Sequence, residues 1–450
     1  MIFADDLGYA DVGVYGARGF ATPNIDRLAR EGIRFTDFHV AQAVCSASRA
    51  GLMTGCYPNR VGITGALEPW DKIGLSDKEL TLPQMLKAVG YATGMVGKWH
   101  LGTPPEFLPT RRGFDDFLGL TLSNDEWPYH PEKPGVFPPL PLMDGEKAVK
   151  AGITPEDLNQ LTTWYTERAV KFIEQNKSRP FFLYVAHTMP HVPLGASEKY
   201  RGKTQRGLYG DACEEIDGST GQIMATLDKA GLTQNTLVIF LSDNGPWLSY
   251  GNHGGSAGPL REGKTTCWEG GHRVPFIARW PEKIPAGKTC DEVAMSIDLL
   301  PTIGKLVGAK LPDHKIDGLD IWPLLAAQPG AKNLHDAYFF YGVPFGQWTG
   351  AQLEAVRSGR WKLVLPHTYR SLNGSAPGAD GLPAKYQPVT IVNPELYNLH
   401  SDIGEKKNVA AENPAVVQRL LALADQCRDD LGDTIVKREG KGVRPAGVVP

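Results

Sequence analysis

The sequence has few of the features that define several large classes of protein. It contains 6 cysteines among 450 residues, and none of them forms a Cys-x-x-Cys pair, which argues against a zinc site. No apolar run reaches the length of a transmembrane helix, so no membrane partner is expected. The net charge is −3 and no long basic run occurs, which argues against nucleic acid as the main partner.

The composition is otherwise that of an ordinary globular chain, with 42% hydrophobic and 22% charged residues. A chain of 450 residues exceeds what one hydrophobic core usually supports, so we expect two domains. The pattern changes character near residue 330, which predicts a division into residues 1–335 and 336–450. No internal repeat or low-complexity tract is present.

In the first of these segments, strand patterns alternate with helix patterns. This alternation predicts an α/β fold in which a large mixed sheet is flanked by helices on both faces. Residues 104–152 are rich in proline and glycine with weak periodicity, so we expect a long surface insertion there. The expected strands lie near residues 2–6, 33–38, 91–96, 181–186, 237–241 and 274–280, and the expected helices near 22–32, 81–89, 155–175, 208–230 and 298–307.

The second segment has a different pattern. Short strands are expected at 338–341, 353–357 and 361–365, followed by a closing amphipathic helix over 413–431. This order predicts a smaller C-terminal α+β domain with an antiparallel sheet. We expect substrate specificity to lie in loops at 104–152 and 366–388, and we hypothesise that His367 and Arg370 overhang the binding pocket and contact a sugar.

The stretch from Val44 to Gly55 contains the most informative cysteine. A helix starting near Cys45 would direct its N-terminal amides and its positive dipole end at the Cys45 side chain. Arg49 follows four residues later and lies on the same face. An anion bound there would meet amides and a guanidinium. Cys45 itself could be a packed thiol or a thiolate whose pKa is lowered by these groups.

Polar side chains follow four predicted strands at the point where each strand ends. The carboxyl ends of the strands in an open α/β sheet form the usual ligand-binding edge, so we expect these side chains to converge. Each pair alone is weak evidence for a site, because such residues are common in turns and helix caps. The pairs are Asp5 with Asp6, Lys98 with His100, His187 with His191, and Asp243 with Asn244.

The chemistry of these groups is consistent with one site. Three carboxylates and an amide oxygen are hard ligands that suit calcium or magnesium. The remaining basic groups suit a tetrahedral oxyanion such as sulfate or phosphate. They are Arg49, Lys98, His100, His191 and Lys264.

The order of these motifs resembles that of the type I sulfatases, which belong to the alkaline phosphatase superfamily and include arylsulfatase A. In that family the signature cysteine is oxidised to formylglycine. Many members have proline at the position of Ala47, and alanine is a known variant. The matching motifs are Ala4-Asp5-Asp6-Leu7-Gly8-Tyr9, Cys45-x-Ala47-x-Arg49, Gly97-Lys98-Trp99-His100-Leu101-Gly102, Pro190-His191-Val192-Pro193, Ser242-Asp243-Asn244-Gly245 and Gly263-Lys264-Thr265-Thr266.

The resemblance implies a bound Ca²⁺, with Mg²⁺ as an alternative. It also implies that Arg49 and the metal stabilise a formylglycine hydrate made from Cys45, and that Asp243 helps to accept its proton. The implied metal ligands are Asp5, Asp6, Asp243, Asn244 and the modified Cys45.

The same resemblance implies roles for the other basic groups. A hydrate oxygen attacks sulfur while Lys98 and Lys264 hold the sulfuryl oxygens. His191 then donates a proton to the leaving alcohol. His100 finally deprotonates the remaining hydroxyl, which expels sulfate and regenerates the aldehyde.

The leading hypothesis is therefore a sulfuric ester hydrolase acting on an aryl sulfate or a sulfated carbohydrate, matured by a formylglycine-generating enzyme. One alternative is a phosphomonoester or phosphonate hydrolase of the same superfamily. A second is an unmatured protein that binds anionic glycans without turnover. His187 has no assigned role, and we expect Cys56 and Cys267 to be packed thiols.

The N-terminus indicates a truncated or late start, because Met1 to Ala4 resembles only the last part of a strand and no signal peptide precedes it. The family resemblance implies a periplasmic or secreted location. If Cys45 is modified, the other five cysteines cannot all pair, so no disulfide framework is expected.

Overall fold

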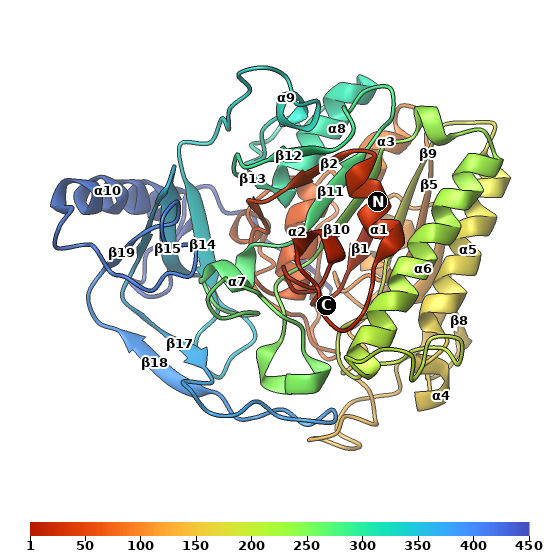
Figure 1. Cartoon of the computed structure of the whole chain (residues 1–450), viewed down its shortest axis with the longest axis horizontal. Helices are drawn as coiled ribbons and strands as arrows, with labels where there is room; N and C mark the ends of the chain where they lie inside the picture. The colour runs from red at the N-terminus through yellow and green to blue at the C-terminus, as the bar shows by residue number, and fades with distance from the viewer. Residues whose placement is uncertain (450) are drawn as a thin grey trace.

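The computed structural model describes residues 1–449, and its main feature is one large sheet (Figure 1). Its ten strands follow the order β12-β2-β11-β10-β1-β9-β5-β6-β7-β8. The central strands from β10 to β6 run parallel, whereas β11, β7 and β8 join antiparallel. The bounds are β1 Ile2–Ala4, β2 Ile33–Phe35, β5 Ala92–Lys98, β6 Asp116–Leu120, β7 Leu142–Asp144, β8 Lys147–Lys150, β9 Phe181–Ala186, β10 Val238–Ser242, β11 Phe276–Arg279 and β12 Lys288–Cys290.

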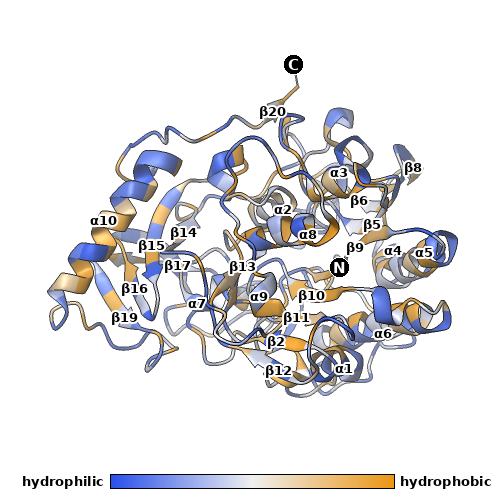
Figure 2. Cartoon of the chain, turned by 90° about the horizontal axis from the view of Figure 1, so that it is seen from above, coloured by the Kyte–Doolittle hydropathy of each residue, from blue (hydrophilic) through white to orange (hydrophobic). Residues whose placement is uncertain are grey.

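Helices cover both faces of this sheet because its central strands are apolar on both sides. Ile2 and Ala4 of β1 belong to the core that packs on α1, α5 and α6, and Phe3 belongs to the core that packs on α2, α3 and α8. Figure 2 shows the apolar residues gathered on the strands between these helices. The bounds are α1 Pro23–Arg30, α2 Cys45–Thr54, α3 Leu82–Lys87, α4 Pro155–Leu158, α5 Leu161–Asn176, α6 Leu208–Lys229, α7 Glu269–His272, α8 Leu299–Val307 and α9 Trp322–Leu325.

The segment 104–152 corrects one prediction. It is not only a surface insertion, because β6 lies in the large sheet beside β5, and β7 and β8 extend that sheet. The strand has five residues and contains Gly119, so it gives little periodic signal. The glycine is needed there, since a Cβ on Gly119 would lie 1.9 Å from the Gly97 carbonyl oxygen. The close approach of β5 and β6 requires a glycine in β6, and this glycine weakens the strand pattern in the sequence.

The C-terminal part contains a smaller antiparallel sheet, as predicted, and the fold class is confirmed. Helix α10 covers this sheet and packs with it in a third apolar core. The strand order is β14-β15-β16-β19. Residues 366–388 are not a plain loop, because β17 pairs with β18. The bounds are β14 Tyr338–Gly342, β15 Gln352–Ser358, β16 Trp361–Val364, β17 His367–Ser371, β18 Gln387–Ile391, β19 Glu395–Asn398 and α10 Pro414–Leu431.

Two short pairs complete the secondary structure. Strand β3 (Phe38–His39) pairs with β13 (Ala294–Met295), and β4 (Ile73–Gly74) pairs with β20 (Gly447–Val448). The third core also includes Trp268 from the first segment, so apolar packing is continuous across residue 335. A domain division at that residue stays a prediction. Among the described residues, no helix is both long and apolar enough to cross a membrane.

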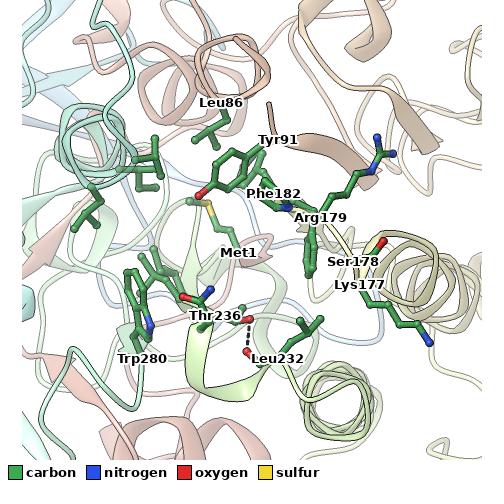
Figure 3. A pocket seen from close by; sticks show the side chains of 18 residues that line it. Met1, Leu86, Tyr91, Lys177, Ser178, Arg179, Phe182, Leu232, Thr236 and Trp280 are labelled. Atoms are coloured by element: carbon green, nitrogen blue, oxygen red, sulfur yellow. Dashed lines mark hydrogen bonds between the residues drawn. The ribbon is translucent and has the colours of Figure 1, made fainter. Parts of the chain in front are cut away.

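A cavity of about 400 Å³ opens at the amino ends of the central strands. Figure 3 shows Met1, Leu86, Tyr91, Phe182 and Trp280 around it. Its lining is mainly apolar side chains and contains none of the predicted site residues. The chemistry predicted from the sequence must therefore be sought at the opposite edge of the sheet.

Candidate active site

Cys45 is the first residue of α2, and the whole helix is buried. The extended Val44 precedes it, and Gly55 ends the helix with φ 69°, donating its amide to the Gly51 carbonyl. The Cys45 side chain is 2% exposed, and its Sγ lies 3.7 Å from Asp5 Oδ1. Burial raises the pKa of this thiol despite the nearby Lys264 and Lys98. The unmodified side chain is therefore a thiol and not a reactive thiolate.

The predicted acidic residues meet because β1 and β10 are parallel neighbours, with Ala4 opposite Ser242. Their carboxyl ends place Asp5 and Asp6 next to Asp243 and Asn244. The Asp6 amide donates to Asp243 Oδ1 at 3.0 Å, and Asn244 Nδ2 donates to Asp6 Oδ1 at 2.6 Å. The four side chains are buried.

These residues fit a hard divalent cation. Asn244 Oδ1 is a buried oxygen with no hydrogen-bond partner, and it lies among three carboxylates. Buried polar atoms are normally paired, so an unpaired acceptor in such a group indicates a missing partner. Asp5, Asp6, Cys45 and His191 also offer ligand atoms within 4.8 Å of one another. An oxygen-rich set of this kind suits Ca²⁺ or Mg²⁺.

Three cations surround the carboxylates. Lys98 at the end of β5 donates to Asp5 Oδ2 at 2.6 Å, and Lys264 donates to Asp6 Oδ2 at 2.9 Å. Arg49 donates to Asp243 Oδ2 at 2.8 Å, and through its other Nη to the Lys98 carbonyl at 2.7 Å. Three carboxylates and three cations therefore neutralise one another in the protein alone.

The carboxylates differ in how well this neutralisation works. Burial favours the protonated form of Asp5, but Lys98 and Arg49 hold its pKa well below the usual range. Burial raises the pKa of Asp6 to about 7, with a further increase from the charges of Asp5 and Asp243 and an opposing effect of Lys264. Burial and Asp5 also raise the pKa of Asp243. The charges are thus equal in number, but Asp6 and Asp243 are incompletely stabilised as anions.

Two histidines complete the edge of the cavity. His100 Nε2 donates to the Leu67 carbonyl at 2.9 Å, which leaves Nδ1 as a buried acceptor without a partner. His191 bonds the Val192 carbonyl through Nδ1, and its Nε2 lies 3.6 Å from Asp6 Oδ2. Burial beside Lys264 and Lys98 lowers the pKa of His191 to about 3, so the free imidazole is neutral.

A cavity of about 250 Å³ opens above these groups. Cys45, His100, His191 and Lys264 line its floor, and the aromatic rings of Trp247, Tyr250 and Trp348 line its wall. The sequence analysis did not single out those three aromatic residues. It also missed Ser123, Asp125 and Glu126, which follow β6 and line the same cavity. Recognition of β6 as a strand of the sheet would have placed its carboxyl end at this edge. Ser123 Oγ accepts from Lys98 Nζ at 3.0 Å.

Other singled-out residues lie elsewhere. His187 is fully buried and neither ring nitrogen has a hydrogen-bond partner, and it does not line the cavity. His367 is 6% exposed on β17 and does not overhang the pocket, which corrects that hypothesis. Arg370 reaches the cavity wall only indirectly, because its guanidinium stacks on Trp348 at 4.7 Å. The six cysteines are buried and free, so no disulfide forms among them.

The fold and this site define a hydrolase of the alkaline phosphatase superfamily. Residues 1–309 match the sulfatase family, and residues 263–373 match the N-sulphoglucosamine sulphohydrolase C-terminal family. The chain belongs to the sulfatase family, as a type I sulfatase.

Similar proteins agree with this assignment. The chain is 39% identical to arylsulfatase A of Homo sapiens over 450 residues, which cover 94% of this chain and 86% of that protein. It is 39% identical to N-acetylgalactosamine-6-sulfatase of Canis lupus familiaris, covering 95% and 84%. The crystal structure of a sulfatase from Pseudoalteromonas sp. superposes with a TM-score of 0.84 at 28% identity, covering 99% of this chain and 91% of that one. The protein is a sulfatase enzyme that hydrolyses sulfate esters.

Proposed function

We propose that this sulfatase cleaves sulfate monoesters of carbohydrates with a formylglycine made from Cys45 and a bound Ca²⁺. The observation that carries the proposal is the position of Cys45. Its Sγ lies at the helix N-terminus and at the cavity floor, 3.7 Å from a carboxylate of the hard-ligand set. Since burial raises the pKa of the thiol, the unmodified side chain would be a poor nucleophile.

Oxidation of Cys45 to formylglycine would supply an aldehyde whose hydrate is the nucleophile. A separate maturation enzyme would carry out that oxidation before the chain folds, since Cys45 is 2% exposed in the folded chain. Such an enzyme is a partner that the proposal requires.

A calcium ion would be held by the oxygens of Asp5, Asp6, Asp243 and Asn244, together with the modified residue 45. The ion would supply positive charge where negative charge develops in the transition state. Support comes from the unpaired Asn244 Oδ1 and from the raised pKa of Asp6. Mg²⁺ would satisfy the same oxygen donors.

The basic side chains would bind and orient the sulfate group. Lys98 and Lys264 are buried cations beside the cavity floor, and their carboxylate partners keep the pKa of each raised. They would donate to sulfuryl oxygens. Arg49 bridges Asp243 and the Lys98 carbonyl, so it would fix the position of both.

The two histidines would handle protons on either side of the reaction. His191 would hold a proton for the leaving alcohol, since a bound anion favours the imidazolium and raises its low pKa. His100 presents an unpaired Nδ1, so it would accept a proton from the hydroxyl next to the sulfate. Asp243, whose pKa is raised, would help to accept a proton from the nucleophile.

The cavity wall favours a carbohydrate over a simple aryl ester. Trp247 and Trp348 meet edge to face at 5.4 Å, and Trp247 meets Tyr250 at 4.8 Å. Aromatic faces beside charged groups are a common platform for the apolar face of a sugar ring. One relative is named for the sulfated sugar N-acetylgalactosamine-6-sulfate, in agreement with this substrate class. We also propose a periplasmic or secreted location, where such polysaccharides occur.

The first test is the mass of the tryptic peptide 35–49 from protein made in its own host. The proposal predicts the mass of an aldehyde or its hydrate in place of the thiol. The same sample should then turn over an aryl sulfate and sulfated sugars faster than an aryl phosphate. Faster turnover of the phosphate would support a phosphomonoester or phosphonate hydrolase, and binding without turnover would support an unmatured glycan-binding protein.

A further inference from the structure

A second cluster of cysteine, carboxylate and histidine lies in the C-terminal core, away from the cavity. Cys267 follows Lys264 by three residues, Glu354 lies on β15, and His367 opens β17. Cys267 is 0% exposed and Glu354 is 1% exposed, and the His367 side chain is fully buried. None of the three lines the active-site cavity.

The distances among the three ligand atoms match three of the four positions of a tetrahedral metal site. Cys267 Sγ lies 3.6 Å from His367 Nε2, and His367 Nε2 lies 3.6 Å from Glu354 Oε2. The three atoms are within 4.8 Å of one another. Zinc bonds of about 2.3 Å to sulfur and about 2.0 Å to nitrogen place such ligand atoms roughly 3.5 Å apart.

The histidine is oriented as a ligand. Its Nδ1 lies 2.7 Å from the Leu365 carbonyl oxygen, and a carbonyl can only accept, so Nδ1 carries the proton. The lone pair of Nε2 therefore faces Cys267 and Glu354. A backbone carbonyl that holds the second ring nitrogen is the usual support of a metal-bound imidazole.

Glu354 is the independent observation that points to a ligand. Neither carboxylate oxygen has a hydrogen-bond partner with good geometry. The pairing of β14 with β15 shifts register at this point, leaving Glu354 without an opposite residue. Such a bulge redirects a side chain. Gly342 on the facing strand makes room, since a Cβ there would lie 2.2 Å from the Glu354 carboxyl carbon.

We propose that Cys267, Glu354 and His367 bind one Zn²⁺ ion, at a site distinct from the calcium site. The thiol and the carboxyl group would each release a proton to solvent, so thiolate, carboxylate and neutral imidazole together neutralise the ion. A thiolate ligand disfavours Ca²⁺ and Mg²⁺. The Cys-x-x-Cys criterion does not detect this site, because its ligands come from three separate segments.

The site would fasten the loop that carries Lys264 to the C-terminal sheet. Cys267 is the only ligand of the three on that loop, whereas Glu354 and His367 belong to β15 and β17. The position of Lys264 would then depend on the metal. This consequence concerns the rigidity of the loop and does not depend on formylglycine or on the substrate.

The test is the zinc content of the purified full chain after exposure to Zn²⁺ and removal of loosely bound metal. The expected result is one zinc per chain, lost in Cys267→Ser and in Glu354→Gln. The matched control Cys213→Ser removes another buried free cysteine, on α6, and should keep the zinc. Cys45→Ala should keep it too, which separates this site from the active site.

Cobalt provides a readout on the wild-type chain, which does not depend on whether the ligand variants fold. The wild-type chain loaded with Co²⁺ should show a thiolate-to-metal absorption band, and the band should persist in Cys45→Ala. The proposal is overturned if the wild-type chain binds no zinc, if Cys267→Ser retains it, or if Cys45→Ala loses it. A thiolate band that disappears in Cys45→Ala would assign the metal to the active site instead.

Discussion

Two buried clusters of this molecule contain the same numbers of charged side chains but differ in how completely these side chains pair with one another. The active-site cluster comprises Asp5, Asp6, Asp243, Arg49, Lys98 and Lys264. The bracing cluster comprises Asp37, Glu269, Glu405, Arg273, Arg357 and Lys362. All twelve residues are less than a tenth exposed. Each cluster has three carboxylates and three cations, so charge count alone does not distinguish a site from a support.

The bracing cluster pairs its charges more completely, with one exception, because burial raises the pKa of Glu405 to about 7. Arg357 on β15 pairs with Asp37 at 2.6 Å, and Lys362 on β16 contacts Glu269 at 3.0 Å and Glu405 at 2.9 Å. Burial favours protonation, but Arg357 lowers the pKa of Asp37, and Lys362 with His39 holds that of Glu269 well below normal. Two of the three carboxylates are thus stabilised as anions. The ion pairs of the cluster connect α7 and the β2–β3 connection to the C-terminal sheet.

The active-site cluster leaves its charge incompletely compensated. Two of its three carboxylates, Asp6 and Asp243, have raised pKa values, and Asn244 Oδ1 is unpaired. A cluster that is paired within the protein stabilises the fold, whereas one that lacks a partner is available to a ligand. Substitutions should therefore separate activity from stability in opposite ways in the two clusters.

The largest expected effect is on activity. Cys45→Ala should lower kcat for an aryl sulfate by about 10⁴-fold or more, because removal of a nucleophile abolishes the covalent route. The melting temperature should change little. Steady-state kinetics measure this, with matured wild-type protein as the reference and matured Cys213→Ala as the control. Retained turnover in Cys45→Ala would place the nucleophile elsewhere.

The next effect is on stability. Arg357→Met should reduce the free energy of unfolding by about 3–5 kcal/mol, because it leaves Asp37 buried without its main partner. Activity per folded molecule should persist. Urea unfolding measures the loss, and Lys310→Met, which removes an exposed pair with Asp313, should change stability by less than about 0.5 kcal/mol. Equal losses in both variants would show that the bracing cluster is no stronger than a surface pair.

Calcium should act on one cluster only. At a concentration a hundred times its Kd, it should stabilise chelator-treated protein by about 2.7 kcal/mol. The Arg357→Met variant should gain the same amount, since its altered cluster is not the one that contains the proposed calcium ligands. Thermal unfolding with and without Ca²⁺ checks this, and Asn244→Ala should reduce the gain. An unchanged melting temperature in the wild-type chain would argue against the proposed metal site.

The smallest effect concerns pH. The pKa of Asp6 is about 7 in the folded chain and about 3.9 when unfolded. The contribution of Asp6 to the free energy of unfolding is therefore fully present below about pH 4, and it is lost as the pH rises through 7. Without metal, Asp6→Asn should be more stable than wild type at pH 8 and equal to it at pH 4.

The matched variant, Asp37→Asn, should show the opposite pH dependence of stability. The pKa of Asp37 is lowered in the folded chain, so its contribution is present above the unfolded pKa and is lost as pH falls through the folded one. Asp37→Asn should be less stable than wild type at pH 8. Urea midpoints across pH test both variants, and calcium should abolish the advantage of Asp6→Asn. A wild type that is the more stable at pH 8 without metal would contradict the assignment for Asp6.

The sequence predicted the active-site cluster because parallel strands end at one edge. The residues after β1, β5 and β10 could be expected to meet from topology alone, and they do. Residues that line the cavity but come from distant parts of the sequence could not be predicted in this way. Trp348 reaches the wall from the segment between β14 and β15, where no local pattern fixes its position.

Two missed strands account for the main errors. Strand β6 is short and contains a glycine, so Asp125 and Glu126 were not recognised as residues at a strand end. Strand β17 lies in a polar segment, so His367 was expected to lie over the pocket and is instead buried against Cys267. In both cases tertiary contacts, not local propensity, determine the structure.

Three backbones of the sheet approach one another closely next to the candidate active site. A Cβ on Gly97 would lie 1.8 Å from the Ala186 oxygen, and one on Gly119 would lie 1.9 Å from the Gly97 oxygen. Gly97 immediately precedes Lys98, and Gly119 is followed within a few residues by Ser123. A methyl group at either position would force neighbouring strands apart and widen the gap between the cation and the opposite wall. The absence of a side chain at these two positions thus allows the strands to lie close together. The distances between groups in the candidate site depend on that narrow spacing.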